Sequence, residues 1–333
     1  MTSTRNTTTT PMRAIVQDQY GTADVLRLQD IDRPEIGDNE VLVRVRAAGV
    51  NPADWAVMGG LPYIARPVYG LRTPKSPVRG TDVAGTVEAV GGGVTRFQPG
   101  DDVFGSANGS YAEYAAAAED GLAPKPANLT FEQAAAAPMA GLVALQAVRD
   151  QGNVQDGQRV LINGAAGGIG TFAVQIAKAL GAHVTGVCSR RNVNFVRSLG
   201  ADHVIDYSAE NFTQGDQRYD FILDNVANHS LSDLRRVLTP TGTLVPNGGS
   251  FDNRWFASGG RVIRARVLTQ FVGHKLRPFL VSFTHEDLVA LKESIEAGKV
   301  TPVIDRTFPL SETPQAIRYV GEGHARGKVV VTV

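Results

Sequence analysis

Alternating hydrophobic and polar positions mark the first third of the chain as strand-rich. Residues 41–46 (VLVRVR) and 85–90 (GTVEAV) show the alternation that is typical of half-buried β-strands. Glycine and proline residues interrupt the pattern repeatedly between Met12 and about Pro126. These features predict an antiparallel or barrel-like domain over this region.

The pattern changes after Pro126. Thr130 precedes an alanine-rich stretch that is typical of a helix, and short apolar runs then alternate with helical segments up to about residue 273. Strands that alternate with helices predict a parallel sheet with helices on its faces. We therefore expect a second domain here.

The C-terminal segment should rejoin the first domain. Residues 286–297 are spaced like an amphipathic helix that ends at Gly298, and residues 328–333 (KVVVTV) are typical of a strand. The predicted organisation is a disordered tail over 1–11, one domain over 12–126 plus 274–333, and a second domain over 127–273.

A glycine-rich turn lies near the start of the second domain. Residues 160–162 (VLI) are typical of a buried strand, residues 163–170 (NGAAGGIG) precede a helix through Leu180, and residues 182–188 supply the next strand. In this βαβ context a glycine pattern predicts dinucleotide binding, with an ordinary glycine-rich connection as the alternative. A Walker-type phosphate loop is disfavoured because no Gly-Lys-Ser/Thr follows.

The chemistry of a pyrophosphate explains these glycines. Phosphates at a helix N-terminus need exposed backbone N–H groups with no side chain in between. Gly167 and Gly168 would allow that approach, and Gly170 would let the helix pack closely on the strand. The predicted cofactor contacts in the turn are Gly164, Ala166, Gly167, Gly168 and Ile169.

The end of the following strand indicates which dinucleotide binds. NAD-dependent enzymes usually carry an acid there, which binds the ribose hydroxyls, whereas this chain has Ser189, Arg190 and Arg191. A guanidinium offers the 2′-phosphate of NADP a charge-assisted partner. We therefore predict NADP(H) as the cofactor, with a solvated pair of arginines as the alternative.

Later strand ends should line the same crevice, because ligands bind outside the carboxyl ends of parallel strands. Tyr207 is expected to cover the adenosine. The turns after the next two strands are expected to hold the ribose and nicotinamide. The alternative is that their residues serve only to form the turns. These turns carry Asn225, Val226, Asn247, Gly248 and Gly249.

Composition narrows the range of partners. Lys+Arg and Asp+Glu both number 33, so the formal net charge is zero and no global field would attract nucleic acid or an anionic membrane. The longest apolar stretches, such as 134–137, fall far short of the roughly 20 residues of a membrane span, so a soluble protein is expected. The single cysteine, Cys188, excludes an intrachain disulfide and fits a reducing cytoplasm.

Six short motifs are spread from Met12 to Val333: AGVNPAD at 48–54, GTDVAG at 80–85, GDDVFG at 100–105, GAAGGIG at 164–170, LGADHVIDY at 199–207 and GKVVV at 327–331. Together they resemble the zinc-free quinone-oxidoreductase branch of the medium-chain dehydrogenase/reductases. The resemblance implies an α/β protein in which a doubly wound Rossmann sheet is inserted into a GroES-like β-barrel domain. It also implies an active site in the cleft between them and a homodimer formed by edge strands.

The resemblance further implies that zinc is absent. The positions that match the Cys, His and Cys ligands of zinc-dependent relatives are Asn51, Thr81 and Met139, whose amide, hydroxyl and thioether groups make a poor zinc set. The six histidines show no metal-binding spacing. We therefore predict no metal site.

Without a Lewis acid, an acceptor that stabilises negative charge by itself is the better substrate. We hypothesise hydride transfer from NADPH C4 to a quinone or an α,β-unsaturated carbonyl. The candidate catalytic residues are Asn51, Asp54 and Tyr63, with turn formation as the alternative for Asn51 and Asp54 and loop packing for Tyr63.

Two other functions stay open. One is a zinc-free NADP-dependent aldehyde or alcohol oxidoreductase, and the other is an NADPH-binding redox sensor with little turnover. Residues 263–279, rich in Val, Leu, Phe and Arg, are expected to cap the nicotinamide end of the cleft, form a subunit contact or pack in the core.

Overall fold

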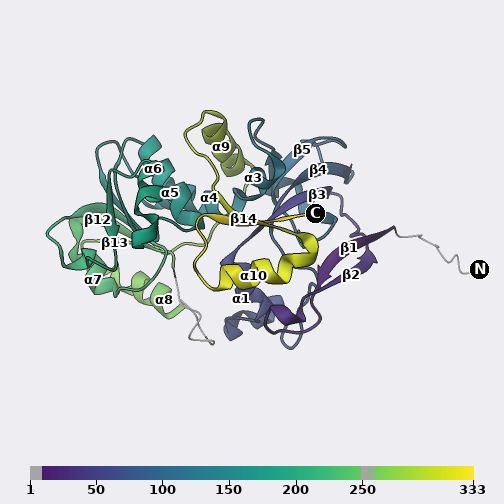
Figure 1. Cartoon of the computed structure of the whole chain (residues 1–333), viewed down its shortest axis with the longest axis horizontal. Helices are drawn as coiled ribbons and strands as arrows, with labels where there is room; N and C mark the ends of the chain where they lie inside the picture. Colours follow the sequence, from purple (N-terminus) through teal and green to yellow (C-terminus); the bar gives the residue numbers. More distant parts are fainter. Residues whose placement is uncertain (1–9, 249–254, 256–258) are drawn as a thin grey trace, which may run out of the picture.

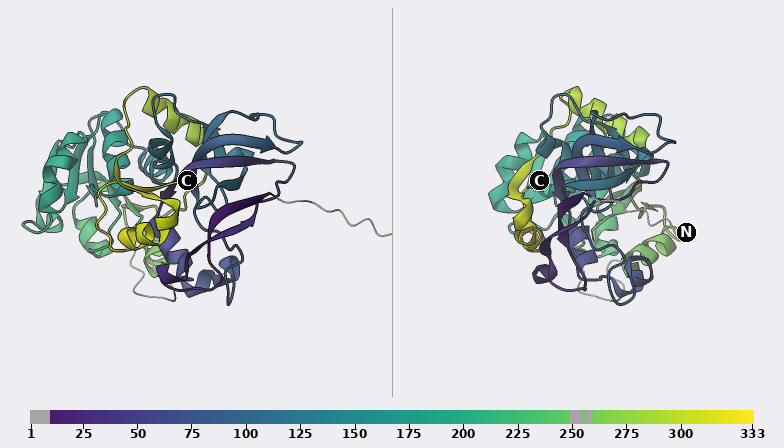
Figure 2. Two further views of the ribbon diagram at one scale, coloured as in Figure 1. Left: turned by 45° about the vertical axis from the view of Figure 1, so that its right-hand side comes forward. Right: turned by 90° about the vertical axis from the view of Figure 1, so that its right-hand side faces the viewer.

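The computed structural model describes residues 10–248, 255 and 259–333. Residues 1–9 of the expected tail, and Gly249 of the expected cofactor site, lie outside the described residues. Figure 1 shows a sheet surrounded by helices at one end of the molecule and a barrel-like sheet at the other. In Figures 1 and 2 the yellow C-terminal segment lies against the purple and blue N-terminal strands.

Six parallel strands form the first sheet, in the order β10-β9-β8-β11-β12-β13. They are β8 (Arg159–Asn163), β9 (His183–Cys188), β10 (His203–Asp206), β11 (Tyr219–Asp224), β12 (Leu238–Pro246) and β13 (Lys275–Leu276). With β8 counted as the first strand, this is the doubly wound Rossmann order, whose crevice opens where the order reverses between β8 and β11. The predicted Rossmann-type sheet is confirmed.

Both faces of this sheet are apolar, because alternate residues of each strand point to opposite faces. Val160 and Ile162 join a core cluster with Phe172 of α5, whereas Leu161 joins another with Leu234 of α7. The helices of this domain are α4 (Pro138–Leu145), α5 (Gly168–Ala179), α6 (Val193–Ser198), α7 (Leu231–Arg236) and α8 (Gly259–Leu268).

Seven strands form the second sheet, in the order β14-β15-β3-β4-β5-β7, with β6 also paired to β3. They are β3 (Glu40–Val50), β4 (Asp82–Val90), β5 (Asp102–Ser106), β6 (Tyr114–Ala118), β7 (Leu122–Pro124), β14 (Ile304–Pro309) and β15 (Lys328–Thr332). β3 and β4, which contain the predicted strands 41–46 and 85–90, pair antiparallel. β15 pairs antiparallel with β3, so both ends of the chain build the GroES-like domain, as expected.

The remaining elements surround this second sheet. A hairpin of β1 (Pro11–Val16) and β2 (Arg27–Asp32) lies beside it. The helices are α1 (Pro52–Met58), α2 (Arg66–Tyr69), α3 (Phe131–Ala135), α9 (His285–Glu296) and α10 (Thr313–Gly321). α9 matches the helix predicted over 286–297, and Gly298 follows with a φ of 69°.

Two expected boundaries differ from the structure. β13 pairs in parallel with β12 over Lys275 and Leu276, so the parallel sheet extends beyond residue 273, where we expected the second domain to end. A two-residue strand has too few positions to show any periodicity. Pro11, expected in the tail, is the first residue of β1, a position that tolerates the missing N–H of proline.

The segment 263–279 is only partly covered. Ala265 of α8 is buried in the core, whereas Ile263, Val267 and Phe271 are 64%, 54% and 81% exposed. Core packing therefore accounts for one side of this segment and leaves an apolar side open. None of the helices in the described ranges is long and apolar enough to cross a membrane.

Candidate active site

The glycine-rich turn joins β8 to α5 with the geometry that its sequence predicts. Gly164 has a φ of 80°, in the left-handed region that favours glycine. A Cβ on Gly170 would lie 2.1 Å from the carbonyl oxygen of Gly164, so only glycine lets the first turn of α5 approach the strand end this closely. The predicted close packing at Gly170 is confirmed.

Packing within the protein does not require a glycine at Gly167, the N-cap of α5. Its φ is −82°, which any residue can adopt, and an added Cβ would come no closer than 3.6 Å to the oxygen of Gly164. The first backbone N–H groups of this 12-residue helix have no acceptor within the helix. The turn therefore leaves donors and space in front of α5 for an anionic group.

Asp224, at the end of β11, joins three strand-end loops. Its side chain is wholly buried, and Oδ1 accepts hydrogen bonds from Asn163 Nδ2 at 2.8 Å and from the Ala227 N–H at 3.1 Å. Its carbonyl oxygen accepts from the N–H groups of Asn247 and Gly248 at 3.0 and 2.7 Å. The ends of β8, β11 and β12 therefore form one connected unit.

Asn225 places an unused donor in this unit. Its Oδ1 accepts from Asn247 Nδ2 at 2.8 Å, whereas its own Nδ2 is buried and has no hydrogen-bond partner among the described residues. A Cβ on Gly164 would lie 2.9 Å from Val226 Cγ2, so Val226 packs beside the glycine turn. The structure thus brings Asn225, Val226, Asn247 and Gly248 to the turn, and their binding of a cofactor stays a prediction.

Ser189, Arg190 and Arg191 follow directly after β9. Both arginine side chains are exposed, and Arg191 Nη2 donates to the carbonyl oxygen of His324 at 3.4 Å. Arg190 opens the short helical turn Arg190–Asn192 beside the strand end. A guanidinium therefore stands at the position where an NAD-dependent enzyme usually carries an acid.

Tyr207 lies at the neighbouring strand end and is 57% exposed. Its backbone N–H donates to the carbonyl oxygen of Cys188 at 3.1 Å, which places it beside the end of β9. Hydrogen bonds from Ser208, together with the nearby charge of Arg190, hold the pKa of Asp206 below its usual range. Tyr207 and Arg190 are thus two exposed residues beside the end of β9.

A buried cluster of polar side chains lies where β15 meets β3 and β4. Lys328, only 3% exposed, donates from Nζ to Oδ1 of Asn51 and lies 3.3 Å from Oδ2 of Asp82. Asp82 is wholly buried and also accepts from Asn51 Nδ2 at 3.0 Å and from the Met139 N–H at 3.1 Å. Burial raises the pKa of Asp82, and the Lys328 ammonium opposes that rise.

This cluster borders the glycine turn. A Cβ on Gly168 would lie 3.1 Å from Lys328 Cδ, and the N–H of Gly327 donates to the carbonyl oxygen of Ala166 at 2.9 Å. Ile169, in the first turn of α5, packs against the main core cluster. The two domains therefore meet at the glycine turn.

Asp54 and Asn51 lie together at the start of α1. The Asp54 carboxylate accepts from the Asn51 N–H at 2.8 Å and from the Tyr111 hydroxyl at 2.9 Å. Burial raises the pKa of Asp54 to about 6, and burial with the nearby Asp54 charge raises the pKa of Tyr111 well above its usual value. These contacts support the turn-forming alternative for Asp54.

Tyr63 takes part in a different set of contacts. Its ring meets Trp255 edge-on at 5.5 Å between centroids, and the Arg66 guanidinium lies 4.4 Å from its centroid. The N–H of Ile64 donates to the carbonyl oxygen of Trp255 at 3.2 Å. Tyr63 thus links the barrel domain to the segment before α8, and its role as a proton donor stays a prediction.

The residues at the positions that match the ligands of zinc-dependent relatives are poorly suited to bind zinc. The Asn51 amide is bonded to Lys328 and Asp82, and the Lys328 ammonium would repel a second cation. Thr81 and Met139 offer a hydroxyl and a thioether, which are poor zinc donors. The described part of the chain holds no group of three or more His, Cys, Asp or Glu side chains suited to a metal ion.

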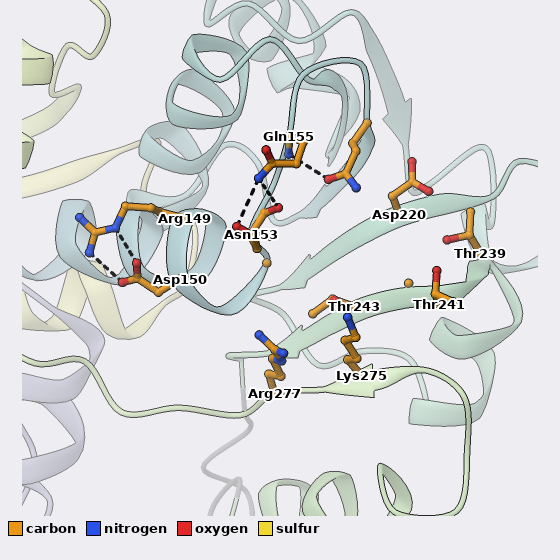
Figure 3. Close-up of a pocket in the computed structure, with 13 residues that line it drawn as sticks. Arg149, Asp150, Asn153, Gln155, Asp220, Thr239, Thr241, Thr243, Lys275 and Arg277 are labelled. Atoms are coloured by element: carbon orange, nitrogen blue, oxygen red, sulfur yellow. Dashed lines mark hydrogen bonds and ion pairs between the residues drawn. The ribbon is translucent and has the colours of Figure 1, made fainter.

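A cavity of about 770 Å³ opens at the opposite, amino-terminal edge of the parallel sheet (Figure 3). Lys275 and Arg277 point into it from β13 and the residues that follow. Arg149 at its rim is paired with Asp150, with 2.5 Å between Nε and Oδ1. The cavity contains none of the predicted cofactor residues, so we assign it no part in the candidate site.

Sequence reasoning missed three buried residues at these sites. Lys328 and Asp82 belong to the motifs GKVVV and GTDVAG, but the motifs gave no sign that the two side chains meet. Asp224 directly precedes the predicted contact Asn225, and we predicted no role for its own side chain. The available signal was that each is a charged residue inside or beside an apolar run, where a charge needs a partner.

Comparisons with known proteins agree with this geometry. The alcohol dehydrogenase GroES-like domain family matches residues 37–127, and the family described as zinc-binding dehydrogenase matches residues 199–331. The mitochondrial NAD(P)H oxidoreductase RTN4IP1 of Mus musculus is 39% identical over 366 residues, covering 99% of this chain and 91% of that protein.

Two further relatives extend the comparison. The chloroplastic NADPH-dependent alkenal/one oxidoreductase of Arabidopsis thaliana is 34% identical over 344 residues, covering 96% of this chain and 79% of that protein. The structure of the quinone oxidoreductase from Coxiella burnetii superposes with a TM-score of 0.84 at 34% identity, covering 97% of this chain and 100% of that one. The chain therefore belongs to the medium-chain dehydrogenase/reductase superfamily, in its quinone oxidoreductase-like branch, and is an oxidoreductase.

Proposed function

We propose that this enzyme transfers a hydride from NADPH to a quinone or an α,β-unsaturated carbonyl without zinc. The observation that carries the proposal is the turn before α5, where a Cβ on Gly167 would meet no atom of the described residues closer than 3.6 Å and the first N–H groups of the helix have no acceptor within it. A dinucleotide pyrophosphate carries the negative charge that such N–H groups bind.

NADPH fits the other residues of the crevice. Ser189 and Arg190 would hold the 2′-phosphate, Tyr207 would cover the adenosine, and the buried Nδ2 of Asn225 would donate to the ribose or nicotinamide. When bound, NADPH supplies the hydride from C4 of its nicotinamide ring. The preference for NADPH over NADH rests on Arg190, because a carboxylate at that position would repel the 2′-phosphate.

Two observations support a quinone or enone as the hydride acceptor: the residues at the matching zinc-ligand positions are poor metal ligands, and relatives are named for such substrates. Without a metal to polarise a simple carbonyl, an acceptor must stabilise negative charge itself, as quinones and conjugated enones do. The printed names of two relatives, an alkenal/one oxidoreductase and a quinone oxidoreductase, support the same class. Asn51, Asp54 and Tyr63 remain the candidate proton donors.

A paired cofactor titration tests the proposal. Wild-type protein should bind NADPH more tightly than NADH, and Arg190→Ala should weaken NADPH binding by about 10- to 100-fold, the worth of one charge-assisted contact, while NADH binding stays unchanged. Arg197→Ala, an exposed arginine of α6, is the matched control and should change neither. Equal losses for both cofactors would refute the 2′-phosphate assignment.

Turnover distinguishes the three candidate functions. NADPH consumption should be fast with quinones and enones and slow with saturated aldehydes. Fast reduction of saturated aldehydes would instead favour an aldehyde or alcohol oxidoreductase. Tight NADPH binding without consumption by any of these acceptors would favour a redox sensor.

The expected homodimer and cytoplasmic location stay proposals. The sheet edge at β13, with exposed Ile263, Val267 and Phe271 on the neighbouring segment, supports association of two copies. Light scattering on the purified protein would measure the mass directly, and a monomer mass would refute the dimer. The two relatives named from Mus musculus and Arabidopsis thaliana are mitochondrial and chloroplastic, so they do not support a cytoplasmic location.

A further inference from the structure

Arg261, in the first turn of α8, reaches two parts of the loop that follows β11. Its Nη2 donates to Oδ2 of Asp224 at 2.5 Å, and its Nη1 donates to the carbonyl oxygen of His229 at 2.7 Å. The Arg261 side chain is 17% exposed and Asp224 is wholly buried. These contacts are therefore charge-assisted hydrogen bonds of the interior and not a solvated surface pair.

The loop between these two contacts has an uncommon conformation. Ala227 has a φ of 64°, which few residues other than glycine adopt, and its N–H is bound by Oδ1 of Asp224 at 3.1 Å. Arg261 binds the other oxygen of the same carboxylate, Oδ2, and also binds the far end of the loop at the His229 carbonyl. A conformation of this kind persists only where surrounding contacts fix it.

The same loop carries the donor that the cofactor would use. Asn225 follows Asp224 directly, and its buried Nδ2 has no hydrogen-bond partner within the described ranges. A Cβ on Gly248 would lie 2.3 Å from the carbonyl carbon of Asn225, so the loop after β12 is packed closely against it. The position of Asn225 therefore depends on Asp224, and the position of Asp224 depends on Arg261.

We propose that Arg261 is a positioning residue for the nicotinamide–ribose end of the cofactor crevice, because its guanidinium clamps Asp224 and the His229 carbonyl and so sets the loop that carries Asn225. It acts through these residues and does not touch the cofactor. The inference rests on the proposed function, since it concerns the same crevice. It adds that α8, outside the βαβ unit, controls one half of the dinucleotide site and not the other.

Three ligands separate the two halves of the site. NADPH and NADH both carry the nicotinamide–ribose half, whereas adenosine 2′,5′-bisphosphate carries only the adenosine and phosphates that Ser189, Arg190 and Tyr207 would hold. Arg261→Ala should weaken NADPH and NADH to the same extent, by roughly 3- to 30-fold, as for residues that act on a site without touching the ligand. Binding of adenosine 2′,5′-bisphosphate should stay within about twofold of wild type.

Arg190→Ala gives the opposite pattern and serves as the internal comparison. It should weaken NADPH and adenosine 2′,5′-bisphosphate and leave NADH unchanged. Arg264→Ala is the matched control on α8, because Arg264 is exposed and lines the same cavity of about 230 Å³ as Arg261. It should change none of the three affinities.

Arg261→Lys guards against a variant that does not fold. Lysine keeps a positive charge beside Asp224, but one ammonium cannot reproduce the planar fork that spans Asp224 and His229, so an intermediate loss for NADPH and NADH is expected. Unchanged NADPH binding in both Arg261 variants would overturn the inference, and so would an equal loss of adenosine 2′,5′-bisphosphate, which would indicate general disruption. Wild-type protein that binds neither NADPH nor NADH would instead overturn the proposed function and this inference with it.

Discussion

Replacing Lys328 by methionine should destabilise the fold strongly, because it leaves Asp82 in the interior without its counter-charge. The Lys328 side chain is 4% exposed and that of Asp82 is wholly buried, with 3.3 Å between Nζ and Oδ2. Removing one partner of a buried ion pair typically costs about 3–5 kcal/mol. We therefore expect Lys328→Met to lower the free energy of unfolding by about 3 kcal/mol or more.

Urea unfolding followed by circular dichroism measures this loss, and two further variants test its cause. Lys292→Met removes a lysine that is paired with Glu296 on α9 at 2.6 Å in an i,i+4 arrangement, and it should cost no more than about 0.5 kcal/mol. Adding Asp82→Asn to Lys328→Met removes the unpaired charge and should restore part of the stability. In that double variant the side-chain amide oxygen at position 82 can still accept a hydrogen bond from Asn51 Nδ2 or from the Met139 N–H.

Two results would refute the reasoning. A loss below about 1 kcal/mol for Lys328→Met would show that the buried pair contributes no more than a surface pair. A double variant less stable than Lys328→Met would show that the single variant is not limited by an unpaired carboxylate at Asp82.

The remaining predictions concern Asp54 and the glycine turn. The pKa of Asp54 is raised from 3.8 to about 6, so between these values the native state holds a proton that the unfolded state has lost. Stability should therefore fall by up to about 3 kcal/mol as the pH rises from about 4 to about 6, and Asp54→Asn should lack this component; a difference between the two proteins that does not change with pH would contradict it. Gly170→Ala should destabilise the fold by about 1–3 kcal/mol, because its Cβ would lie 2.1 Å from a backbone oxygen, whereas Gly167→Ala should leave urea unfolding within about 0.5 kcal/mol of wild type. Gly167→Ala should nevertheless weaken NADPH binding at least about tenfold, and unchanged binding would show that the pyrophosphate does not approach Gly167.

The parallel sheet could be predicted because its strands are buried on both faces and read as continuous apolar runs. Residues 160–162 are the plainest case, since Val160 and Ile162 face one core cluster and Leu161 the other. The glycine turn was equally readable, because its spacing has a local cause in the φ of Gly164 and the close approach at Gly170. Both features arise from residues that are close in sequence, so a short stretch of sequence is enough to predict them.

The buried cluster could not be predicted, because its contacts join distant parts of the chain. Lys328 meets Asn51 across 277 positions and Asp82 across 246. A lysine at the start of an apolar strand is usually exposed, and only the pairing of β15 with β3, and of β3 with β4, turns this one inward between two strands. Asp54 was nearer to prediction, since an Asn followed three residues later by an Asp is close to the capping-box pattern of a helix start.

Asp82 explains why a buried charge is kept at the junction of the two domains. Stability alone is a weak reason, because apolar replacements of buried ion pairs are often neutral or stabilising. An apolar pair, however, could not form the directional hydrogen bonds that hold neighbouring groups in place. Asp82 accepts hydrogen bonds from Asn51 Nδ2, from the Met139 N–H at the start of α4 and from Lys328, whose side chain lies beside Gly168. One carboxylate thus fixes a polar side chain of the barrel, a helix start of the Rossmann domain and a neighbour of the glycine turn in a single arrangement.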